Sequence, residues 1–346
     1  MITNYSTAQM LQLVSHMPSP SNFWLSLAFM EQVNFTTTEI DFDKIKGGRR
    51  IAPFVAPTVQ GKVMRDIGYE TKSFTPAYLK PKHVVDPSRM FTRKAGEPFG
   101  GNLTPDQRRQ AIIVDNVKTE KEMIERRWEL MAAEAIMDGQ VTVSGEDYDT
   151  KVVDFGRDPG QTVTLTGTDL WSDSGSNPYQ DLEAWSVQTS RLCGFAIRDW
   201  ILGADAWNAL MTHADTKDLL DRTVSNGNAT LQAGPGNIPD DGAIVELKGT
   251  VGVGIRIWTY QDVYEDDNGD LIEVMPSDSI IGVNPRGLRG VRCFGAIMDN
   301  KAGLAAHEIF AKNWFNEDPS VEYTMSQSAP LMVPKEPNAS LKAKVV

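Results

Sequence analysis

The most regular pattern of apolar and polar positions runs from residue 104 to residue 138. Apolar residues recur there at steps of four, seven, four, three and four, on one side of a helix: Ile113, Val117, Ile124, Trp128, Met131 and Ala135. Thr104, Pro105 and Gln107 form a capping box with proline at the first helical position, and Gly139 is a suitable stop. The opposite side is charged, with Arg108, Lys118, Glu122 and Arg126. The pattern predicts an amphipathic helix about 50 Å long, lying along one face of a sheet.

After this helix, apolar runs alternate with turn residues. The runs predict strands at 141–143, 151–156, 161–167, 243–249, 252–260, 271–276, 279–284 and 321–333. Helices are predicted at 178–200 and 201–222, a surface loop at 225–242, and a solvated Lys-bearing tail at the end of the sequence. The order lacks the regular βαβ alternation of a doubly wound sheet, so the sequence predicts an α+β fold.

The first 50 residues are typical of an arm. Met10, Leu11, Leu13, Val14 and Met17 fit one side of a short helix, which prolines at 18 and 20 interrupt before a second apolar cluster at 23–25. Two interpretations remain open. The helix packs on its own domain, or the arm lies on a neighbouring subunit.

Residues 51–95 alternate charged and apolar positions without building a core. Prolines at 57, 76, 81 and 87 limit strand pairing, and Gly68 lies near the middle, where a hairpin would turn. A long two-stranded hairpin is marginally stable alone in water, so we expect it to lie on another surface. The alternative is an irregular surface loop, although loops of this length are uncommon in compact domains.

Composition narrows the class of protein. The 346 residues are 41% hydrophobic and 23% charged, which suits a soluble globular protein of two domains or one elaborate domain. The net charge of -12 argues against wrapping DNA by phosphate neutralisation. This charge is compatible with a container that encloses DNA without gripping it.

Cys193 and Cys293 suggest no disulfide framework, and the first basic residue is Lys44, so a signal peptide is not expected. A reducing cytosol is the simpler interpretation.

The sequence offers no convincing catalytic, cofactor or metal site. Histidines at 16, 83, 213 and 307 lack metal-motif spacing. Residues 265–270 resemble a calcium loop, but Tyr264 and Met275 occupy positions that require oxygen ligands, and Asn268-Gly269 instead predicts a hairpin turn. The glycines of 249–258 continue into β-branched residues rather than a helix, so a phosphate loop is not expected.

Three arginines lie three positions apart among glycines, at 286, 289 and 292. Nucleic-acid contact and salt bridges within or between subunits are both compatible with this spacing. The acidic chain favours salt bridges.

Several segments are similar to one known family. Residues 58–87, 108–117, 154–157, 312–315 and 324–333 resemble the major capsid (head) proteins of lambda-like tailed bacteriophages, and the resemblance covers nearly the whole chain. It implies the Hong Kong 97-type capsid fold, with an N-terminal arm (1–50), an extended hairpin loop (51–95), a peripheral domain with a long spine helix (96–170 and 318–346) and an axial domain (171–317).

The resemblance also implies a function. A capsid subunit of this kind is expected to form homo-pentamers and homo-hexamers that close into an icosahedral shell around double-stranded DNA. Expected partners are a scaffold, a portal, a decoration protein and a maturation protease that acts on other shell components. Neither catalysis nor a cofactor, membrane contact or Lys–Asn cross-link is expected. The protein is expected in the virion, and in the host cytoplasm during assembly.

Charged residues on the predicted extended loop and in the arginine segment are the candidate inter-subunit contacts: Lys62, Arg65, Glu70, Lys72, Lys80, Lys82, Arg286 and Arg289. Two other classes remain as alternatives. One is an encapsulin-like compartment with enzyme cargo, and the other is a carboxylate-based hydrolase, which would need a concave pocket with perturbed acids.

Overall fold

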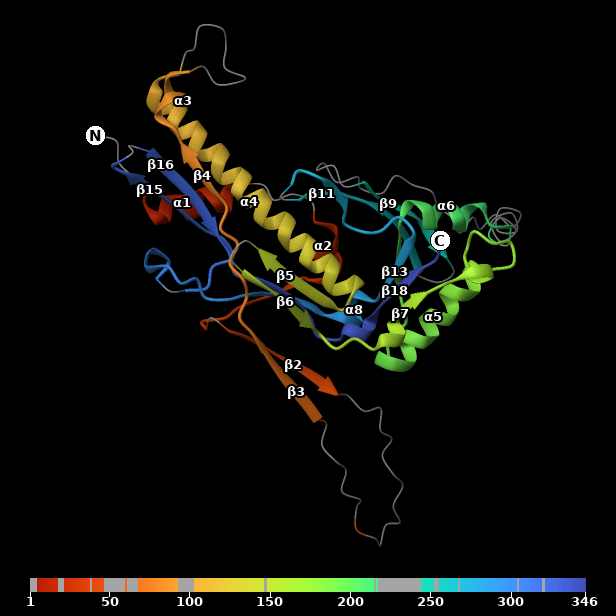
Figure 1. The fold of residues 1–346 in the computed structure, drawn as a ribbon. Helices are drawn as coiled ribbons and strands as arrows, with labels where there is room; N and C mark the ends of the chain where they lie inside the picture. The colour runs from red at the N-terminus through yellow and green to blue at the C-terminus, as the bar shows by residue number, and fades with distance from the viewer. Residues whose placement is uncertain are drawn as a thin grey trace.

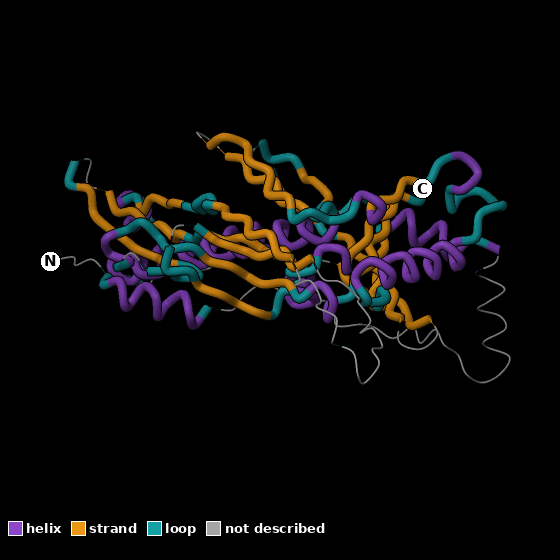
Figure 2. Tube along the Cα trace, turned by 90° about the horizontal axis from the view of Figure 1, so that it is seen from below, coloured by secondary structure: helices purple, strands orange, loops and turns teal. Residues whose placement is uncertain are grey.

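The computed structural model describes residues 5–17, 22–37, 39–46, 60, 68–92, 103–145, 148–214, 216, 244–251, 255–266, 268–303, 305–318 and 321–346. These residues form a flat wedge, broad in the view of Figure 1 and shallow when seen from below in Figure 2. One long helix crosses the wedge obliquely, with sheets on either side of its length.

That helix is α4 (Pro105–Met137), and it begins and ends as predicted, to within a residue. The Thr104 side chain accepts from the Gln107 N–H, and the Gln107 side chain accepts from the Thr104 N–H, which completes the capping box. Every residue of the predicted apolar stripe is buried. On the charged side, Glu122 forms its ion pair with Lys118, at 3.6 Å.

At the N-terminal half of α4 lies an antiparallel sheet of three strands, in the order β15 (Phe310–Asn316), β16 (Val321–Gln327) and β4 (Lys82–Val85). Residues 321–333 were predicted as one strand, and that prediction was wrong. The chain leaves β16 at Gln327 and starts β17 (Pro330–Pro334), which belongs to a different sheet.

The second three-stranded sheet has β14 (Gly290–Phe294) at its centre, with β1 (Glu31–Asn34) parallel on one side and β17 antiparallel on the other. Strand β17 is buried throughout and packs on α4. Phe294 of β14 meets Trp128 of α4 edge to face, with ring centroids 5.1 Å apart. The sheet therefore buries the C-terminal half of the helix stripe.

Six strands make the largest sheet, in the order β7 (Thr162–Thr164), β18 (Ser340–Lys344), β13 (Ser279–Val283), β8 (Asp199–Leu202), β10 (Ile255–Gln261) and β9 (Ile244–Val251). The prediction of a solvated C-terminal tail was wrong. Strand β18 lies between β7 and β13, and Leu341, Ala343 and Val345 are fully buried.

Two helices pack beside this sheet, α5 (Pro178–Cys193) and α6 (Ala204–Thr212). The predicted helices at 178–200 and 201–222 were too long, because β8 occupies 199–202 between them. Gly194, in the left-handed conformation, ends α5. The predicted loop at 225–242, and the end of the second predicted helix, lie outside the described residues.

The N-terminal helices pack on their own chain. Helix α1 (Thr7–His16) buries Met10 and Val14, and α2 (Phe23–Ala28) buries Trp24 and Leu25, all within the core cluster that includes α4. Of the two interpretations of this region, packing on its own domain is therefore the one that the structure supports.

A two-stranded ribbon leaves the body at its lower edge in Figure 1. It pairs β2 (Ile40–Lys46) antiparallel with β3 (Gly68–Phe74). The prediction of a turn at Gly68 was wrong: Gly68 starts β3 opposite Lys46, so the first strand of the hairpin comes from 40–46. Ile40 is fully buried and Phe42 meets Phe155 at 5.7 Å, which anchors the base of the ribbon.

Two further antiparallel hairpins are present, β5 (Gln140–Gly145) with β6 (Tyr148–Asp154), and β11 (Val263–Glu265) with β12 (Leu271–Glu273). The predicted turn at Asn268-Gly269 is confirmed, with Gly269 at φ 88°. Two short helices, α3 (Pro87–Phe91) and α8 (Pro285–Leu288), complete the elements discussed below.

Candidate functional site

Helix α4, which is described over its whole length, buries five charged side chains: Arg109, Glu120, Lys121, Glu125 and Glu129. Charged residues are rarely buried unless they are paired, so each of these needs a partner. Glu125 pairs with Lys121 of the same helix, at 3.8 Å, and the other partners belong to elements distant in sequence. The charged positions of α4 therefore show how this helix holds the rest of the chain.

Near the start of α4, Arg109 forms a two-pronged contact with Glu322 of β16. Its Nε and one terminal nitrogen donate to the two carboxylate oxygens at 2.7 and 2.6 Å. The Asn313 side-chain amide of β15 donates to the same carboxylate at 2.8 Å. This planar pairing fixes both distance and orientation between the helix and the sheet.

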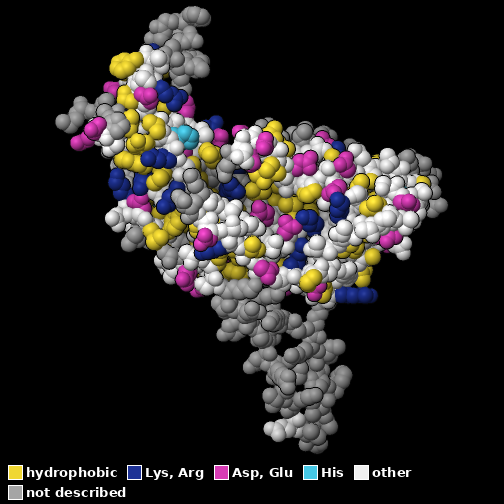
Figure 3. All heavy atoms as spheres, viewed as in Figure 1, with side chains coloured by type: hydrophobic (Ala, Val, Ile, Leu, Met, Phe, Trp, Pro, Cys, Tyr) yellow, Lys and Arg dark blue, Asp and Glu magenta, His cyan; other side chains and the backbone are white. Residues whose placement is uncertain are grey.

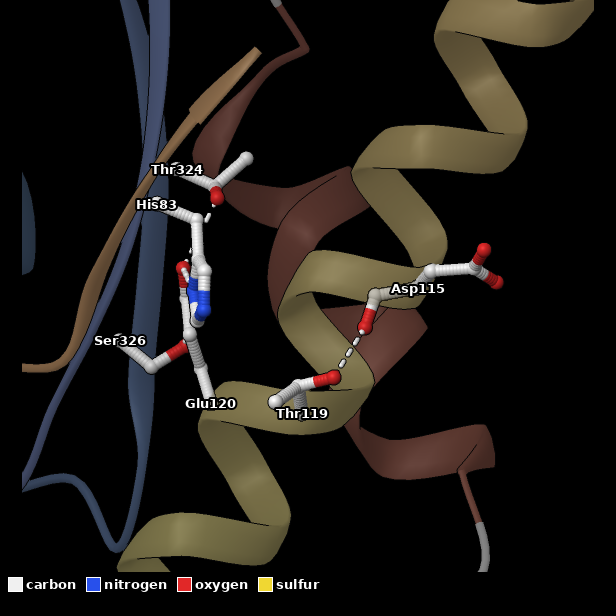
Figure 4. Close-up of polar contacts among 6 residues, drawn as sticks. All are labelled: His83, Asp115, Thr119, Glu120, Thr324 and Ser326. Carbon is white, nitrogen blue, oxygen red and sulfur yellow. Dashed lines mark hydrogen bonds and ion pairs between the residues drawn. The ribbon is translucent and has the colours of Figure 1, made fainter. Parts of the chain in front are cut away.

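About three turns further along, Glu120 points into the same sheet (Figure 4). The hydroxyls of Thr324 and Ser326 donate to its two oxygens at 2.8 and 2.7 Å, and His83 Nδ1 of β4 lies 3.1 Å from one of them. Burial raises the pKa of Glu120, and these hydrogen bonds partly offset the increase. On the solvent side of the helix, the exposed Thr119 hydroxyl donates to the backbone carbonyl of Asp115, so that pair plays no part in the cluster.

The N-terminal helices are held by their ends. Lys121 Nζ donates to the carbonyls of Val14 and Met17 at 3.4 and 2.8 Å, at the C-terminus of α1. Glu129 accepts from the backbone N–H groups of Trp24 and Leu25 at 2.6 and 3.0 Å, at the N-terminus of α2. A cation at a helix C-terminus and an anion at a helix N-terminus both match the free backbone groups there.

The outward face of the β15–β16–β4 sheet combines lysines with aromatic rings. Trp314 and Tyr323 stack at 5.5 Å, and Lys82 Nζ lies 3.8 Å from the centre of the Tyr323 ring. Lys312 lies 5.3 Å from the Trp314 ring and pairs with Asp299. Figure 3 shows apolar and basic side chains interleaved over this end of the molecule. The mixture differs from the acidic balance of the whole chain.

The structure describes the side chains of only some of the predicted contact residues. Lys80 and Lys82 are exposed and lie over the rings of Tyr78 and Tyr323. Lys62 and Arg65 lie outside the described residues, and Glu70 and Lys72 are described only as backbone positions of β3.

The predicted arginines lie elsewhere, at α8. Arg286 and Arg289 are exposed, and Arg289 ends the helix with a positive φ of 47°. Their neighbour Arg292 reaches Glu308 at 4.0 Å, at the limit for an ion pair. The arginine segment therefore does not join the lysines of β4 in one site.

Sequence reasoning missed the buried charges of α4, although the pattern contained a signal. The apolar stripe takes a step of seven from Val117 to Ile124, and Glu120 and Lys121 stand where the missing apolar residue belongs. A charged residue on the buried side of a helix predicts a buried polar partner. Thr324 and Ser326, two positions apart on β16, supply that partner.

Neither a metal group nor a membrane helix emerges from the part of the chain that the structure describes. It holds no cluster of three or more His, Cys, Asp or Glu side chains suited to a metal ion. None of its helices is both long enough and apolar enough to cross a membrane.

The arrangement of sheets around a long helix defines the class of protein. A proposed capsid protein of an Escherichia coli CFT073 prophage has the same fold, with a TM-score of 0.76 at 21% identity over 100% of both chains. The mature capsid of bacteriophage PhiM1 gives a TM-score of 0.51 at 10% identity over 95% of this chain and 88% of that chain. The fold is the Hong Kong 97-type α+β capsid fold, as the resemblance implied.

Sequence comparison then identifies the family. The model for "Phage major capsid protein E" matches residues 6–345. The major capsid protein of Enterobacteria phage P21 is 32% identical over 348 residues, 99% of both chains, and that of Escherichia phage lambda is 32% identical over 342 residues, 96% of this chain and 97% of its own. The chain belongs to the phage major capsid protein E family, which is a family of structural capsid proteins.

Proposed function

We propose that this chain self-assembles as pentamers and hexamers into an icosahedral shell that encloses the double-stranded DNA genome of a phage. The observation that carries the proposal is the β2–β3 ribbon, which extends away from the body of its own subunit (Figure 1). A two-stranded ribbon is marginal alone in water. A neighbouring subunit supplies the surface that it lacks.

The contacts between subunits are proposed to be numerous and individually weak. Single exposed ion pairs contribute about 0–1 kcal/mol, so Lys80, Lys82 and the charged residues of the extended loop act together rather than singly. Each subunit presents its ribbon on one side and the surface that receives a neighbour's ribbon on a different side. The resulting contact is head-to-tail. Such contacts close into rings when the rotation allows it.

The proposed domains follow the capsid fold: an arm (1–50), an extended loop (51–95), a peripheral domain (96–170 and 318–346) and an axial domain (171–317). The position of β18 supports one change. Because β18 pairs with β13 and β7 in the six-stranded sheet, we assign residues 340–346 to the axial domain with that sheet. The extended loop, in turn, takes in β2.

Partners are proposed by the same reasoning. A scaffold and a portal direct the closure of the shell in the host cytoplasm, and a decoration protein stabilises it afterwards. The genome is enclosed without specific binding, because a net charge of -12 disfavours phosphate contact over the whole surface.

Sedimentation velocity with negative-stain imaging tests the proposal, on protein expressed with and without a scaffold. We expect uniform shells, tubes or capsomer rings from the intact chain. Deletion of 60–72 is expected to leave a folded subunit, by circular dichroism, that makes no shells. Normal shells from that deletion contradict the role of the ribbon, and a strict monomer of the intact chain under both conditions contradicts the assembly itself.

A further inference from the structure

The β11–β12 hairpin presents one exposed face that is both apolar and acidic. In its antiparallel register, Val263 lies opposite Glu273 and Glu265 lies opposite Leu271. Directly paired residues, and residues two positions apart, share a face of a hairpin, so these four side chains lie on the same side. All four are exposed, with Val263 at 45% and Leu271 at 72%. This outward face therefore combines two apolar side chains with two carboxylates.

The rest of the hairpin is held in place by its own subunit. Tyr264 is partly buried against the core, and Val274 and Met275 beyond β12 are buried. Asp266 orders the turn, because one of its oxygens accepts from two backbone N–H groups at 2.9 and 2.8 Å. Within the described residues, the two strands pair only with each other. An open apolar surface of this kind gains stability when a partner covers it.

The complementary chemistry occurs where the C-terminal end of α5 meets α8. Two apolar side chains are exposed there, Leu192 at 45% and Phe195 at 37%. Four exposed arginines accompany them: Arg191, Arg198, Arg286 and Arg289. We call these six residues the α5–α8 patch.

Packing of the chain after α5 against α8 joins the two parts of this patch. A Cβ added to Gly287 of α8 would meet the Phe195 ring at 2.8 Å, so the ring lies directly on that helix. The Arg198 N–H donates to the Val283 carbonyl, just before α8, at 3.1 Å. Residues 195–198 therefore run alongside α8, and the arginines of both segments belong to one region of the surface.

The patch arginines have no carboxylate partner among the described residues. Arg109, Arg256 and Arg292 each form an ion pair, whereas none of the four patch arginines does. Glu336, whose backbone N–H bonds to α8, uses its carboxylate to accept from the Asn338 N–H. A guanidinium group pairs with a carboxylate through two parallel hydrogen bonds. A partner for this patch must therefore be both acidic and apolar.

We propose that the outward face of the β11–β12 hairpin of one copy docks on the α5–α8 patch of a second copy of this chain. The two glutamates of the face meet guanidinium groups, and its two apolar side chains meet Leu192 and Phe195. The proposal rests on the self-assembly described above and names the two surfaces that one contact between subunits joins.

The two surfaces lie apart on one subunit. Figure 1 shows β11 toward the upper side of the molecule, and α5 and α8 toward the lower side. Each copy therefore gives its hairpin to one neighbour and receives a hairpin from another. Opposite charges on different sides select this head-to-tail order and disfavour pairs related by a twofold axis.

Duplex DNA is the competing partner for exposed arginines. Two observations favour a protein. The patch includes two exposed apolar side chains, which gain nothing from a phosphate backbone, and the chain itself carries a matching acidic and apolar face. Contact with DNA is therefore an outcome that the experiments below must distinguish.

Charge reversal in the hairpin is the first test. The variant E265K/E273K keeps Asp266, which orders the turn, and reverses both carboxylates of the outward face. Because both glutamates are exposed, we expect a subunit that folds as the unaltered chain does, by circular dichroism and melting temperature. The yield of shells is expected to fall by about tenfold or more.

The matched control makes the same change of charge elsewhere. E317K/D318K reverses two exposed acids just beyond the end of β15 and is expected to assemble normally. Loss of shells to the same degree in this control would attribute the effect to net charge and overturn the inference.

Reversal of both surfaces tests the assignment of the partner. R191E/R286E reverses two patch arginines, keeps Arg289 with its positive φ, and is expected to assemble as poorly as E265K/E273K. The combined variant E265K/E273K/R191E/R286E carries both reversals in every copy. Each contact then joins opposite charges again, in pentamers and hexamers alike, so shells are expected to return. A combined variant that assembles no better than either pair alone overturns the docking.

Loss of the apolar contact gives an independent measurement. Leu271→Ser is expected to leave the melting temperature of the subunit unchanged, because Leu271 is exposed, and to lower the yield of shells. Shells at normal yield from both L271S and E265K/E273K overturn the inference while the proposed function stands. Failure of the unaltered chain to assemble instead refutes the proposed function. Normal shells from R191E/R286E that hold less nuclease-protected DNA assign the arginines to the genome, and this result also overturns the inference.

Discussion

At the scale of single residues, two kinds of side chain on α4 have different effects. The apolar stripe supplies most of the burial, but apolar contact has no direction and tolerates a shift of the helix along the sheet. The Arg109–Glu322 pair and the Glu120 hydrogen bonds have direction, because each requires a particular residue of β16 opposite a particular turn of the helix. Specificity of the packing is the role that we assign to them.

The Arg109–Glu322 pair gives a prediction of stability. Arg109→Met leaves the Glu322 carboxylate buried without its cation, and we expect the free energy of unfolding to fall by about 3–5 kcal/mol. The double variant R109M/E322L removes both charges and is expected to recover most of that loss. Urea denaturation of the two single variants and the double variant measures the coupling. Additive losses would show that the pair is not coupled.

Glu129 gives a prediction of pH dependence. Burial raises its pKa from 4.5 to about 7, with Asp262 adding to the increase and the Trp24 and Leu25 N–H groups opposing it. The folded state therefore binds this proton more tightly than the unfolded state does. The stability that protonation contributes is fully present below about pH 4.5 and is lost as the pH rises through about 7.

Glu129→Gln is expected to remove this component. The free energy of unfolding of the unaltered chain should fall, relative to that of the variant, by about 3 kcal/mol as the pH rises across this range. Chemical denaturation at several pH values measures the difference. Parallel curves for the two proteins would contradict an ionisation of Glu129 in this range. Glu120, whose pKa burial also raises, remains in both proteins and cancels in the comparison.

At the scale of elements, β18 and the β2–β3 ribbon differ in their importance for folding. The fold needs β18, whereas the ribbon extends away from the body of the subunit. Removing residues 340–346 takes β18 out of the six-stranded sheet and leaves β7 and β13 without their shared neighbour. We expect this truncation to abolish folding, unlike the deletion of 60–72. Soluble yield and circular dichroism check the outcome. Lys344→Ala, which loses only the ion pair with Asp278, is the control that should fold.

The elements that local pattern determines were predictable. The capping box and stripe of α4, and the Asn268-Gly269 turn, depend on residues a few positions apart. Elements that depend on distant partners were not. Strand β8 (Asp199–Leu202) has three apolar residues after Asp199, which also suit the end of a helix. Its pairing with β13 and β10 determines that this segment is a strand.

The same limit applies to the candidate contact residues. Sequence reasoning found two exposed lysines, Lys82 at the start of β4 and Lys80 just before it, because charge predicts exposure. It did not find that Lys82 packs on Tyr323, because the two are 241 positions apart in the sequence and meet only through the pairing of β4 with β16. The buried cluster at Glu120 depends on the same pairing.

At the scale of the whole molecule, cohesion between subunits is expected to be entirely non-covalent. Some proteins with this fold form Lys–Asn cross-links, but we expect none here, with decoration as the source of added strength. Assembled shells boiled in denaturant should therefore give a single band at the subunit mass of 38.2 kDa on a gel. A ladder of higher bands would contradict this expectation.

Strand β18 also has a consequence for the timing of synthesis. It follows the other five strands of its sheet in the sequence, yet it lies inside that sheet between β7 and β13. A ribosome makes the other five strands of that sheet first, and the sheet stays open until residues 340–344 emerge. A nascent chain on a polysome therefore lacks a finished subunit to offer its neighbours. We therefore expect the order of the strands to delay completion of the subunit, and with it shell formation, until this region has been translated.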